Sequence, residues 1–130
     1  MLNDYQRFVQ STTSKQSIEM KDFTNSCQDL AQHIHSVPLL LTASIGLASE
    51  CGEFSEIVKK LIFQGKPFTG TEHYHMVREL GDVAWYLANA CTALGVSFED
   101  VIKENISKLE ARYPNGFEVI RSENRAEGDL

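Results

Sequence analysis

The chain contains GLASECGEFSEIVKK at residues 46–60 and ELGDVAWYL at residues 79–87, and each stretch carries two acidic residues three positions apart. The pairs are Glu50 with Glu53 and Glu79 with Asp82. Positions i and i+3 lie on the same face of an α-helix, so each pair directs two carboxylates the same way. The pattern predicts two helices, each with a pair of carboxylates on one face.

A short segment that breaks the helical pattern separates these two helices. It reads QGKPFTGT at residues 64–71, where the first glycine is a typical helix stop and the proline cannot continue a helix. Thr71 is the predicted N-cap of the second helix. At ~1.5 Å per residue, Glu53 lies roughly 16 Å before the end of its helix and Glu79 roughly 12 Å after the start of the next. An antiparallel hairpin would bring the two acidic pairs to similar heights.

Four carboxylates that meet in a mostly apolar hairpin repel one another, and both the repulsion and the loss of water raise their pKa values. A divalent cation removes that conflict, and a ligand set made only of oxygen suits Mg²⁺ or Mn²⁺ better than zinc. The alternative is that each pair belongs to a solvated helix face, as most exposed glutamates do. Gly52 and Gly81, inside helical patterns, predict close approach of another backbone or a ligand. The predicted metal ligands are Glu50, Glu53, Glu79 and Asp82.

Length and charge exclude several classes of function. A chain of 130 residues predicts one domain, and a net charge of −6 argues against nucleic acid held on a basic surface. The three cysteines, Cys27, Cys51 and Cys91, are predicted to be buried reduced thiols. The sequence shows no signal peptide and no apolar run of membrane-spanning length. We therefore expect a cytoplasmic protein with neither a nucleic-acid nor a membrane partner.

The segments outside the central hairpin are less informative. Residues 1–36 are predicted to form an N-terminal helical extension, with helices near residues 3–13 and 18–35. His33 and His35 are interpreted as partly exposed histidines at a helix end, with a role beside Phe23 in holding a nucleobase as the alternative. Residues 118–130 are polar and are expected to be frayed or draped on a partner.

The two central helices are apolar on more than one side. A helix that is apolar all round must be buried all round, and two such helices cannot bury each other completely. We therefore expect an all-α fold in which the hairpin pairs with that of a second subunit as a four-helix bundle. In the second helix the residues concerned are Val83, Ala84, Trp85, Tyr86, Leu87, Ala88, Ala90, Cys91, Ala93 and Leu94.

A last helix is predicted to begin after Gly95, with Ser97 as its cap, and to end before Pro114. Its apolar stripe comprises Phe98, Val101, Ile102, Ile106, Leu109 and Tyr113. Beside that stripe runs a polar row of Asn105, Lys108 and Arg112. One interpretation of the row is a solvated flank with Lys108 paired to Glu104, and the other is a binding surface.

Three blocks in this order, residues 46–60, 79–87 and 105–114, resemble the MazG family of all-α nucleoside triphosphate pyrophosphohydrolases. The family pattern is ExxE, a spacer and ExxD, and here 25 residues separate Glu53 from Glu79. The likeness extends over about residues 38–117, so we assign 37–117 to a MazG-like domain. It implies Mg²⁺-dependent hydrolysis of a ribo- or deoxyribonucleoside triphosphate to the monophosphate and pyrophosphate, by a homodimer or tetramer.

The resemblance also implies roles for single residues. Glu53 would take the proton from the attacking water. The phosphate-binding residues would be Lys59, Lys60, Asn105, Lys108, Arg112 and Tyr113. Two other interpretations remain open: a non-catalytic helical interaction module whose carboxylates pair with basic residues, and a metal-dependent phosphohydrolase of another substrate class. The chain has no glycine-rich phosphate loop and no GxSxG motif, so the nucleotide site would depend on the carboxylates.

Overall fold

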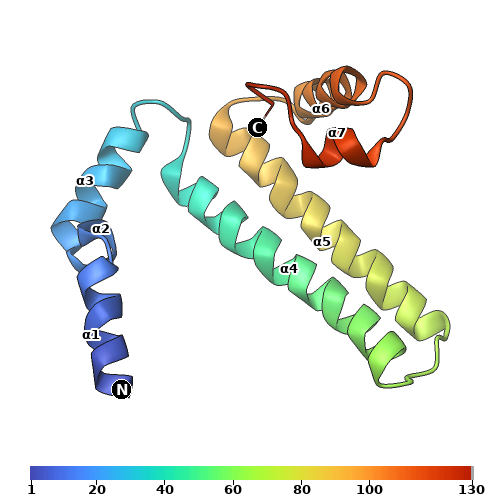
Figure 1. The fold of residues 1–130 in the computed structure, drawn as a ribbon, viewed down its shortest axis with the longest axis horizontal. Helices are drawn as coiled ribbons and strands as arrows, with labels where there is room; N and C mark the ends of the chain where they lie inside the picture. Colours follow the sequence, from blue (N-terminus) through green and yellow to red (C-terminus); the bar gives the residue numbers. More distant parts are fainter. Residues whose placement is uncertain (130) are drawn as a thin grey trace.

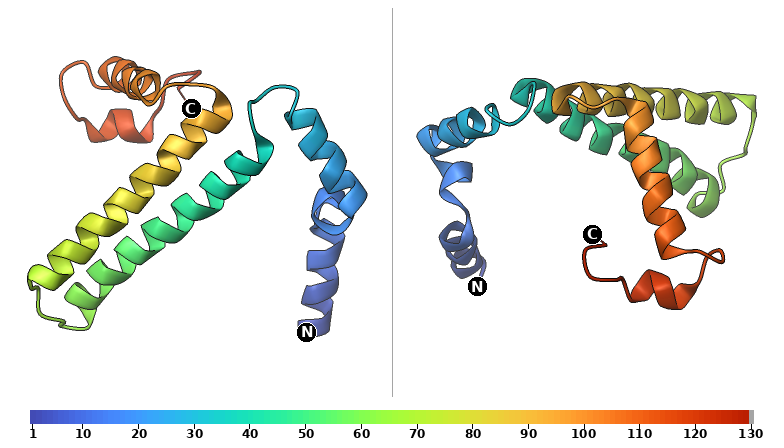
Figure 2. Two further views of the ribbon diagram at one scale, coloured as in Figure 1. Left: turned by 180° about the vertical axis from the view of Figure 1, so that it is seen from behind. Right: turned by 90° about the horizontal axis from the view of Figure 1, so that it is seen from above.

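The computed structural model of the protein describes residues 1–129, which contain α-helices and no strand, as the sequence predicts (Figure 1). The helices are α1 (Leu2–Thr12), α2 (Lys15–Ile18), α3 (Met20–Leu30), α4 (Val37–Phe63), α5 (Gly70–Leu94), α6 (Phe98–Arg112) and α7 (Val119–Glu123). Helices α4 and α5 form the predicted antiparallel hairpin, and α1–α3 form an arm beside it. Figure 2 shows α6 leaving the hairpin at a steep angle.

Local capping explains where the hairpin helices begin and end. Ser36 caps α4, and its hydroxyl oxygen accepts a hydrogen bond from the Leu39 N–H at 3.2 Å, while Pro38 occupies the first turn. Gly95 ends α5 with φ of 75°, a left-handed conformation that glycine adopts without steric cost. At the same end, the His35 N–H donates to the Ala93 carbonyl at 2.9 Å. The start of α4 is thereby tied to the end of α5.

Only a thin core lies between α4 and α5. The buried apolar residues are Val37, Ala43, Cys91 and Ala93. Gly46 is also buried, and a Cβ added there would lie 2.1 Å from Cε1 of Tyr86, so the absence of a side chain permits this helix contact. Gly52 and Gly81, in contrast, have no atom within 4 Å of such a Cβ. Within one chain, the close approach predicted at these two glycines is absent.

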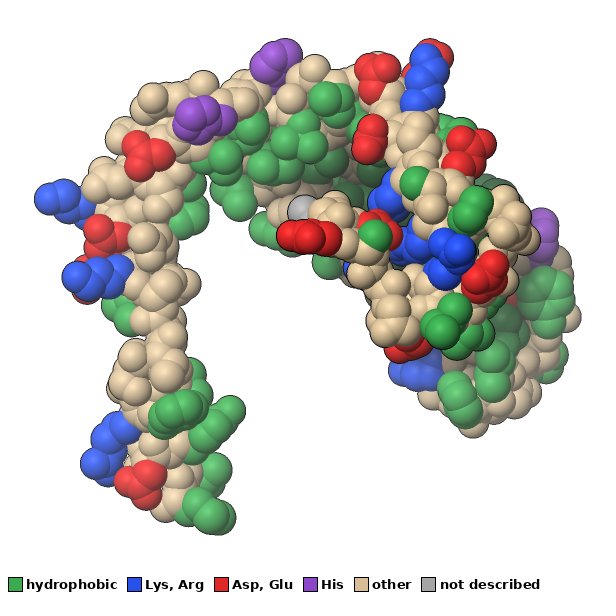
Figure 3. Space-filling model, turned by 45° about the horizontal axis from the view of Figure 1, so that its top comes forward, with side chains coloured by type: hydrophobic (Ala, Val, Ile, Leu, Met, Phe, Trp, Pro, Cys, Tyr) green, Lys and Arg blue, Asp and Glu red, His purple; other side chains and the backbone are tan. Residues whose placement is uncertain are grey.

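Large apolar side chains remain exposed on the single chain. Leu80 is 53% exposed and Trp85 is 58% exposed, although the sequence predicts a helix that is buried all round. Figure 3 shows hydrophobic side chains gathered on the inner side of the arch formed by the arm, the hairpin and the α6–α7 end. The chain exposes 10225 Å², whereas folded monomers of this mass expose roughly 6,900 Å². In the single chain, much of the apolar surface that the sequence predicts to be buried is therefore exposed.

Three sequence expectations need correction. The N-cap of α5 is Thr69 and not Thr71, because Glu72 at the third helical position completes a capping box with Thr69. Cys51 is exposed and Cys27 is half-buried, so only Cys91 is a buried thiol. The C-terminal segment forms α7 and returns to α6, because Asp129 accepts hydrogen bonds from the Arg112 guanidinium. The end of this segment is therefore tied to α6, although Val119 and Ile120 remain 66% and 69% exposed.

Candidate active site

The register of the hairpin sets the heights of the acidic residues. The contact of Gly46 with Tyr86 places these two residues opposite each other on antiparallel helices. One turn further along α4 and one turn back along α5, Glu50 is level with Asp82. A little less than one turn beyond, Glu53 is level with Glu79. The contact at Gly46 thus brings the two acidic pairs to the same stretch of the hairpin.

Three of the four predicted metal ligands come together in the structure. Glu50, Glu53 and Glu79 each offer a carboxylate oxygen, and these oxygens lie within 4.8 Å of one another. Glu50 and Glu79 are half-buried, whereas Glu53 is exposed. Asp82 is exposed and lies outside this close group, although its charge acts on Glu50. We refer to the four residues together as the acidic site.

Electrostatics at the acidic site favour binding of a cation. Partial burial is the largest effect that raises the pKa of Glu50 above its ordinary value. The negative charges of Glu53, Asp82 and Glu79 raise this pKa further, and so does a hydrogen bond with Glu79. All of these effects act against the ionised form of Glu50, and no basic side chain acts in the opposite direction. A bound cation would restore the balance of charge.

The donor set fits the ion that the sequence predicts. Carboxylate oxygens are hard ligands, and Mg²⁺ and Mn²⁺ are bound by one or two carboxylates together with waters and substrate phosphates. Zinc sites use mainly histidine and cysteine, and the only nearby residue of that kind, Cys51, does not belong to the close group. The residues present are therefore suited to Mg²⁺ or Mn²⁺.

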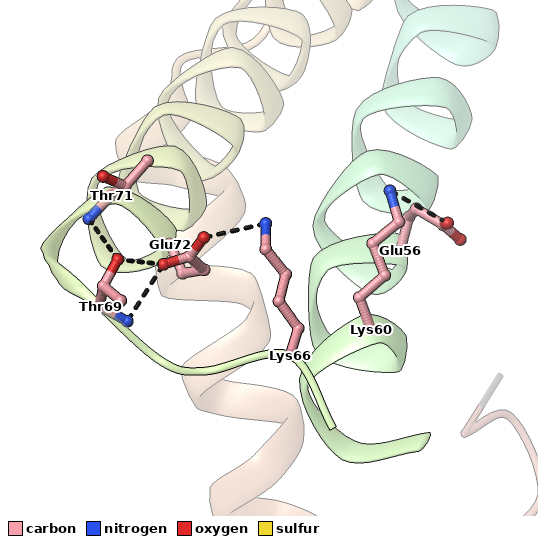
Figure 4. A network of polar contacts seen from close by, with 6 residues as sticks. All are labelled: Glu56, Lys60, Lys66, Thr69, Thr71 and Glu72. Atoms are coloured by element: carbon pink, nitrogen blue, oxygen red, sulfur yellow. Dashed lines mark hydrogen bonds and ion pairs between the residues drawn. The ribbon is translucent and has the colours of Figure 1, made fainter. Parts of the chain in front are cut away.

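The end of the hairpin holds the predicted phosphate-binding lysines of α4 in ion pairs. Lys59 and Lys60 both form ion pairs with Glu56. The distance between Lys60 Nζ and a Glu56 oxygen is 3.4 Å (Figure 4). The hydrogen bond from Lys59 is the main cause that lowers the pKa of Glu56. Both lysines follow Glu53 by about two helical turns. They lie between the acidic site and the connecting loop.

The same end of the hairpin contains a buried carboxylate that sequence analysis missed. Glu72 is 5% exposed, and it accepts hydrogen bonds from the Thr69 N–H at 3.1 Å and from the Thr69 hydroxyl. Lys66 forms an ion pair with it at 2.9 Å (Figure 4). These interactions, the Thr69 hydrogen bond first, lower the pKa of Glu72 to about 2. The Thr-x-x-Glu spacing at residues 69–72 was the available sequence signal.

The polar row of α6 lies apart from the acidic site. No hydrogen bond or ion pair within residues 1–129 joins the row to the four carboxylates. Arg112 Nε instead donates to an Asp129 oxygen at 2.6 Å, and the guanidinium lies 5.9 Å from the ring centre of Tyr113. Lys108 lines a surface groove of about 510 Å³ together with Asp129. The pair of Lys108 with Glu104, which belongs to the interpretation of the row as a solvated flank, does not form in the described part of the chain.

His33, His35 and Phe23 are the residues that the sequence offers for holding a nucleobase, and His35 has a structural contact. The His35 ring lies against Gly95, where an added Cβ would be 2.6 Å from the ring. His33 is exposed. Phe23 lines an apolar groove of about 370 Å³ between α3 and the start of α4, together with Val37 and Leu41. A base-binding role for Phe23 stays a prediction.

Comparison with known proteins gives the family. The sequence model of the MazG nucleotide pyrophosphohydrolase domain matches residues 40–117, which is more than half of the chain. The chain belongs to the MazG family. The resemblance predicted from the three sequence blocks is thereby confirmed, and MazG membership implies hydrolase activity on nucleotides.

Among individual proteins, the Gene 37 protein of Mycobacterium phage L5 is 33% identical over 82 residues. That alignment covers 62% of this MazG chain and 72% of the phage protein. No solved structure matches the chain significantly. None of the helices within residues 1–129 is long and apolar enough to cross a membrane.

Proposed function

We propose that this MazG protein is a Mg²⁺-dependent nucleoside triphosphate pyrophosphohydrolase that releases a nucleoside monophosphate and pyrophosphate. The observation that carries the proposal is the convergence of Glu50, Glu53 and Glu79, whose oxygens lie within 4.8 Å of one another on the hairpin of a MazG domain. Both ribo- and deoxyribonucleotides fall within the proposed substrate class. Mn²⁺ is the alternative ion, because it accepts the same ligands.

In this proposal the acidic site holds the ion and orients the triphosphate. The chemistry that Mg²⁺ supplies when bound is acidification of a water and neutralisation of charge on the phosphates. Glu53 is the exposed member of the close group, so it is the carboxylate we assign as general base for the attacking water. Lys108 and Arg112 hold the outer phosphates, and Asn105, Tyr113, Lys59 and Lys60 line the approach. The water then attacks the α-phosphorus and pyrophosphate leaves.

The active protein is proposed to be a dimer or a tetramer. The accessible surface of the single chain exceeds the value for a folded monomer by roughly 3,300 Å². Obligate dimers bury about 1,000–2,500 Å² on each partner, so pairing of two hairpins would remove about a third to three quarters of this excess. The exposed Trp85 and Leu80 would then be covered in a four-helix bundle.

A panel of triphosphates tests the proposal. Purified protein with Mg²⁺ should release pyrophosphate and monophosphate in equal amounts, and EDTA should stop the reaction. Glu53→Gln removes a charge with little change of volume, so it should abolish turnover and leave the helical content intact. Glu99→Gln is the matched control, because Glu99 is an exposed carboxylate paired only with Lys103 on α6.

The assay also separates the two other interpretations. Release of orthophosphate, with a nucleoside diphosphate as the second product, would indicate a phosphohydrolase of another class. A well-folded protein that turns over no phosphoanhydride with Mg²⁺ or Mn²⁺ would indicate an interaction module. Either result would overturn the proposed function.

A further inference from the structure

We propose that Arg78 on α5 binds the phosphate chain of the substrate, and that this chain leads from the acidic site towards the loop that connects α4 and α5. This contact rests on the proposed function, because the triphosphate is the substrate of that reaction. The outer phosphates then lie on the loop side of the acidic site, and the nucleoside lies on the other side.

Arg78 is the only lysine or arginine of the hairpin that has no acidic partner within residues 1–129. The other three, Lys59, Lys60 and Lys66, each form an ion pair with a glutamate of the hairpin. Arg78 takes part in none of the ion pairs in the described part of the chain. Its positive charge is therefore available to a ligand.

Arg78 does not pair with the acidic residue nearest to it on the same face of α5. Asp82 follows it by four positions, a spacing that permits an ion pair on a helix. The guanidinium carbon lies instead 5.9 Å from the ring centre of Tyr74, one turn in the other direction. Helical side chains lean towards the N-terminus, which in α5 is the loop end. Asp82 thus stays free for a metal ion, and the guanidinium lies on the loop side of the acidic site.

Charge is distributed unevenly along the hairpin. On the loop side of the acidic site, residues 54–78 contain four lysine or arginine residues and two acidic residues. On the other side, residues 37–49 of α4 and residues 83–94 of α5 contain no charged residue. A triphosphate adds several negative charges to those of the carboxylates, so its phosphate chain is attracted towards the basic side. The uncharged side is left for the nucleoside.

The surroundings of Arg78 suit a contact with phosphate. A guanidinium donates two parallel hydrogen bonds to a phosphate, which gives the contact a direction as well as a charge. Arg78 is exposed and Tyr74 is 60% exposed, so a phosphate reaches the guanidinium from solvent. The Tyr74 ring attracts the guanidinium and limits where it lies. Arg78 is thus assigned as a substrate-binding residue and Tyr74 as its positioning residue.

Kinetics of Arg78→Ala test the contact. An outer phosphate is held equally well before and during the reaction, so the loss of this contact should raise the KM about tenfold and leave kcat within about twofold. Arg78→Lys keeps the charge but not the two-point contact, so its KM should lie between those of the wild type and Arg78→Ala. An active wild type with an unchanged KM in Arg78→Ala would overturn this inference alone. An inactive wild type would overturn the proposed function.

The matched control is Lys103→Ala, because Lys103 is an exposed lysine of α6 that pairs with Glu99. It loses the same charge as Arg78→Ala, away from the acidic site, and should keep the KM of the wild type. A KM raised as much as in Arg78→Ala would indicate a general effect of net charge, and it would contradict a specific contact at Arg78.

A double-mutant cycle tests the positioning role. Tyr74→Leu removes the aromatic face beside the guanidinium, so it should raise the KM about two- to fivefold in the otherwise wild-type chain. In the Arg78→Ala chain the same change should have no effect, because Tyr74 acts through the guanidinium. Equal effects of Tyr74→Leu in the two chains would contradict this role.

Equilibrium binding locates the contact without turnover. Isothermal titration calorimetry with Mg²⁺ compares the α,β-methylene analogue of the best triphosphate, in which the bond to be cleaved is replaced, with the corresponding monophosphate. If Arg78 holds an outer phosphate, Arg78→Ala should lose about tenfold in affinity for the analogue and almost none for the monophosphate. Equal losses for the two ligands, or no loss for the analogue, would overturn the inference.

Discussion

Replacement of Gly46 by alanine tests the packing that sets the register of the acidic site. The added Cβ would lie 2.1 Å from Cε1, 2.3 Å from Cδ1 and 2.4 Å from Cζ of Tyr86. Carbon atoms in contact are ~3.5–4.0 Å apart, so the Tyr86 ring must move by roughly 1.5 Å. Overpacking of this kind costs about 1–3 kcal/mol, while alanine in place of glycine within a helix returns about 1 kcal/mol. Glu50 follows one turn later on α4, so the part of the clash that is relieved by separation of the helices would also move Glu50 away from Glu79.

Gly52→Ala is the matched comparison, because it lies on the same helix and its added Cβ meets nothing within 4 Å in the chain. Both variants gain the same helix propensity, so the difference between their free energies of unfolding isolates the clash, about 1–3 kcal/mol. Urea unfolding followed by circular dichroism, at one protein concentration because association affects stability, measures this difference. Gly46→Ala should also need more Mg²⁺ for half-maximal activity. A Gly46→Ala protein as stable as Gly52→Ala, with unchanged Mg²⁺ dependence, would refute the proposed register.

Three further predictions follow from other contacts. The pKa of Glu72 is lowered to about 2 from an ordinary 4.5, so its ionised form stabilises the fold fully above pH 4.5 and loses this effect as the pH falls towards 2. Acid unfolding followed by circular dichroism should therefore be less steep for Glu72→Gln, and an unchanged acid limb would disprove the assignment. Asp129→Asn removes the carboxylate that forms an ion pair with Arg112, so it should lower the KM for triphosphate several-fold with kcat unchanged. An unchanged or higher KM would argue against an anion site at Arg112. Trp85→Glu should convert the oligomer to monomer or prevent folding, because a buried unpaired charge costs several kcal/mol, and a folded oligomer of unchanged size in sedimentation would contradict the proposed interface.

Helical periodicity carried most of the information about the hairpin. The spacing of Glu50 from Glu53, and the short break before α5, were enough to predict that acidic pairs on two helices reach the same height, because rise per residue is constant in an α-helix. Gly95 and Ser97 marked helix ends correctly, since left-handed glycine and N-cap serine act locally. Thr69 was missed in favour of Thr71, although Glu72 three positions later favoured the earlier threonine.

Long-range features could not be obtained from such patterns. The pairing of Arg112 with Asp129 joins residues 17 positions apart across an irregular segment, and no helical period predicts it. The direction of α6 depends on the backbone between Gly95 and Ser97 and on packing against α5. The sequence therefore predicted which face of α6 carries the polar row, but it could not predict where that face points relative to the hairpin. Gly52 and Gly81 show the converse, because the pattern predicts close contacts that a single chain does not make.

Hydrolysis of a nucleoside triphosphate in ¹⁸O-labelled water, with Mg²⁺ and analysis of each product by mass spectrometry, tests the central claim most directly. Attack of water on the α-phosphorus predicts one ¹⁸O atom in the nucleoside monophosphate and none in pyrophosphate. Label in pyrophosphate would place the attack on the β-phosphorus. That result would contradict the proposed attack on the α-phosphorus at Glu50, Glu53, Glu79 and Asp82, although the products would still be monophosphate and pyrophosphate. Label in orthophosphate, with unlabelled nucleoside diphosphate as the other product, would mean cleavage at the γ-phosphorus and would contradict the pyrophosphohydrolase activity itself.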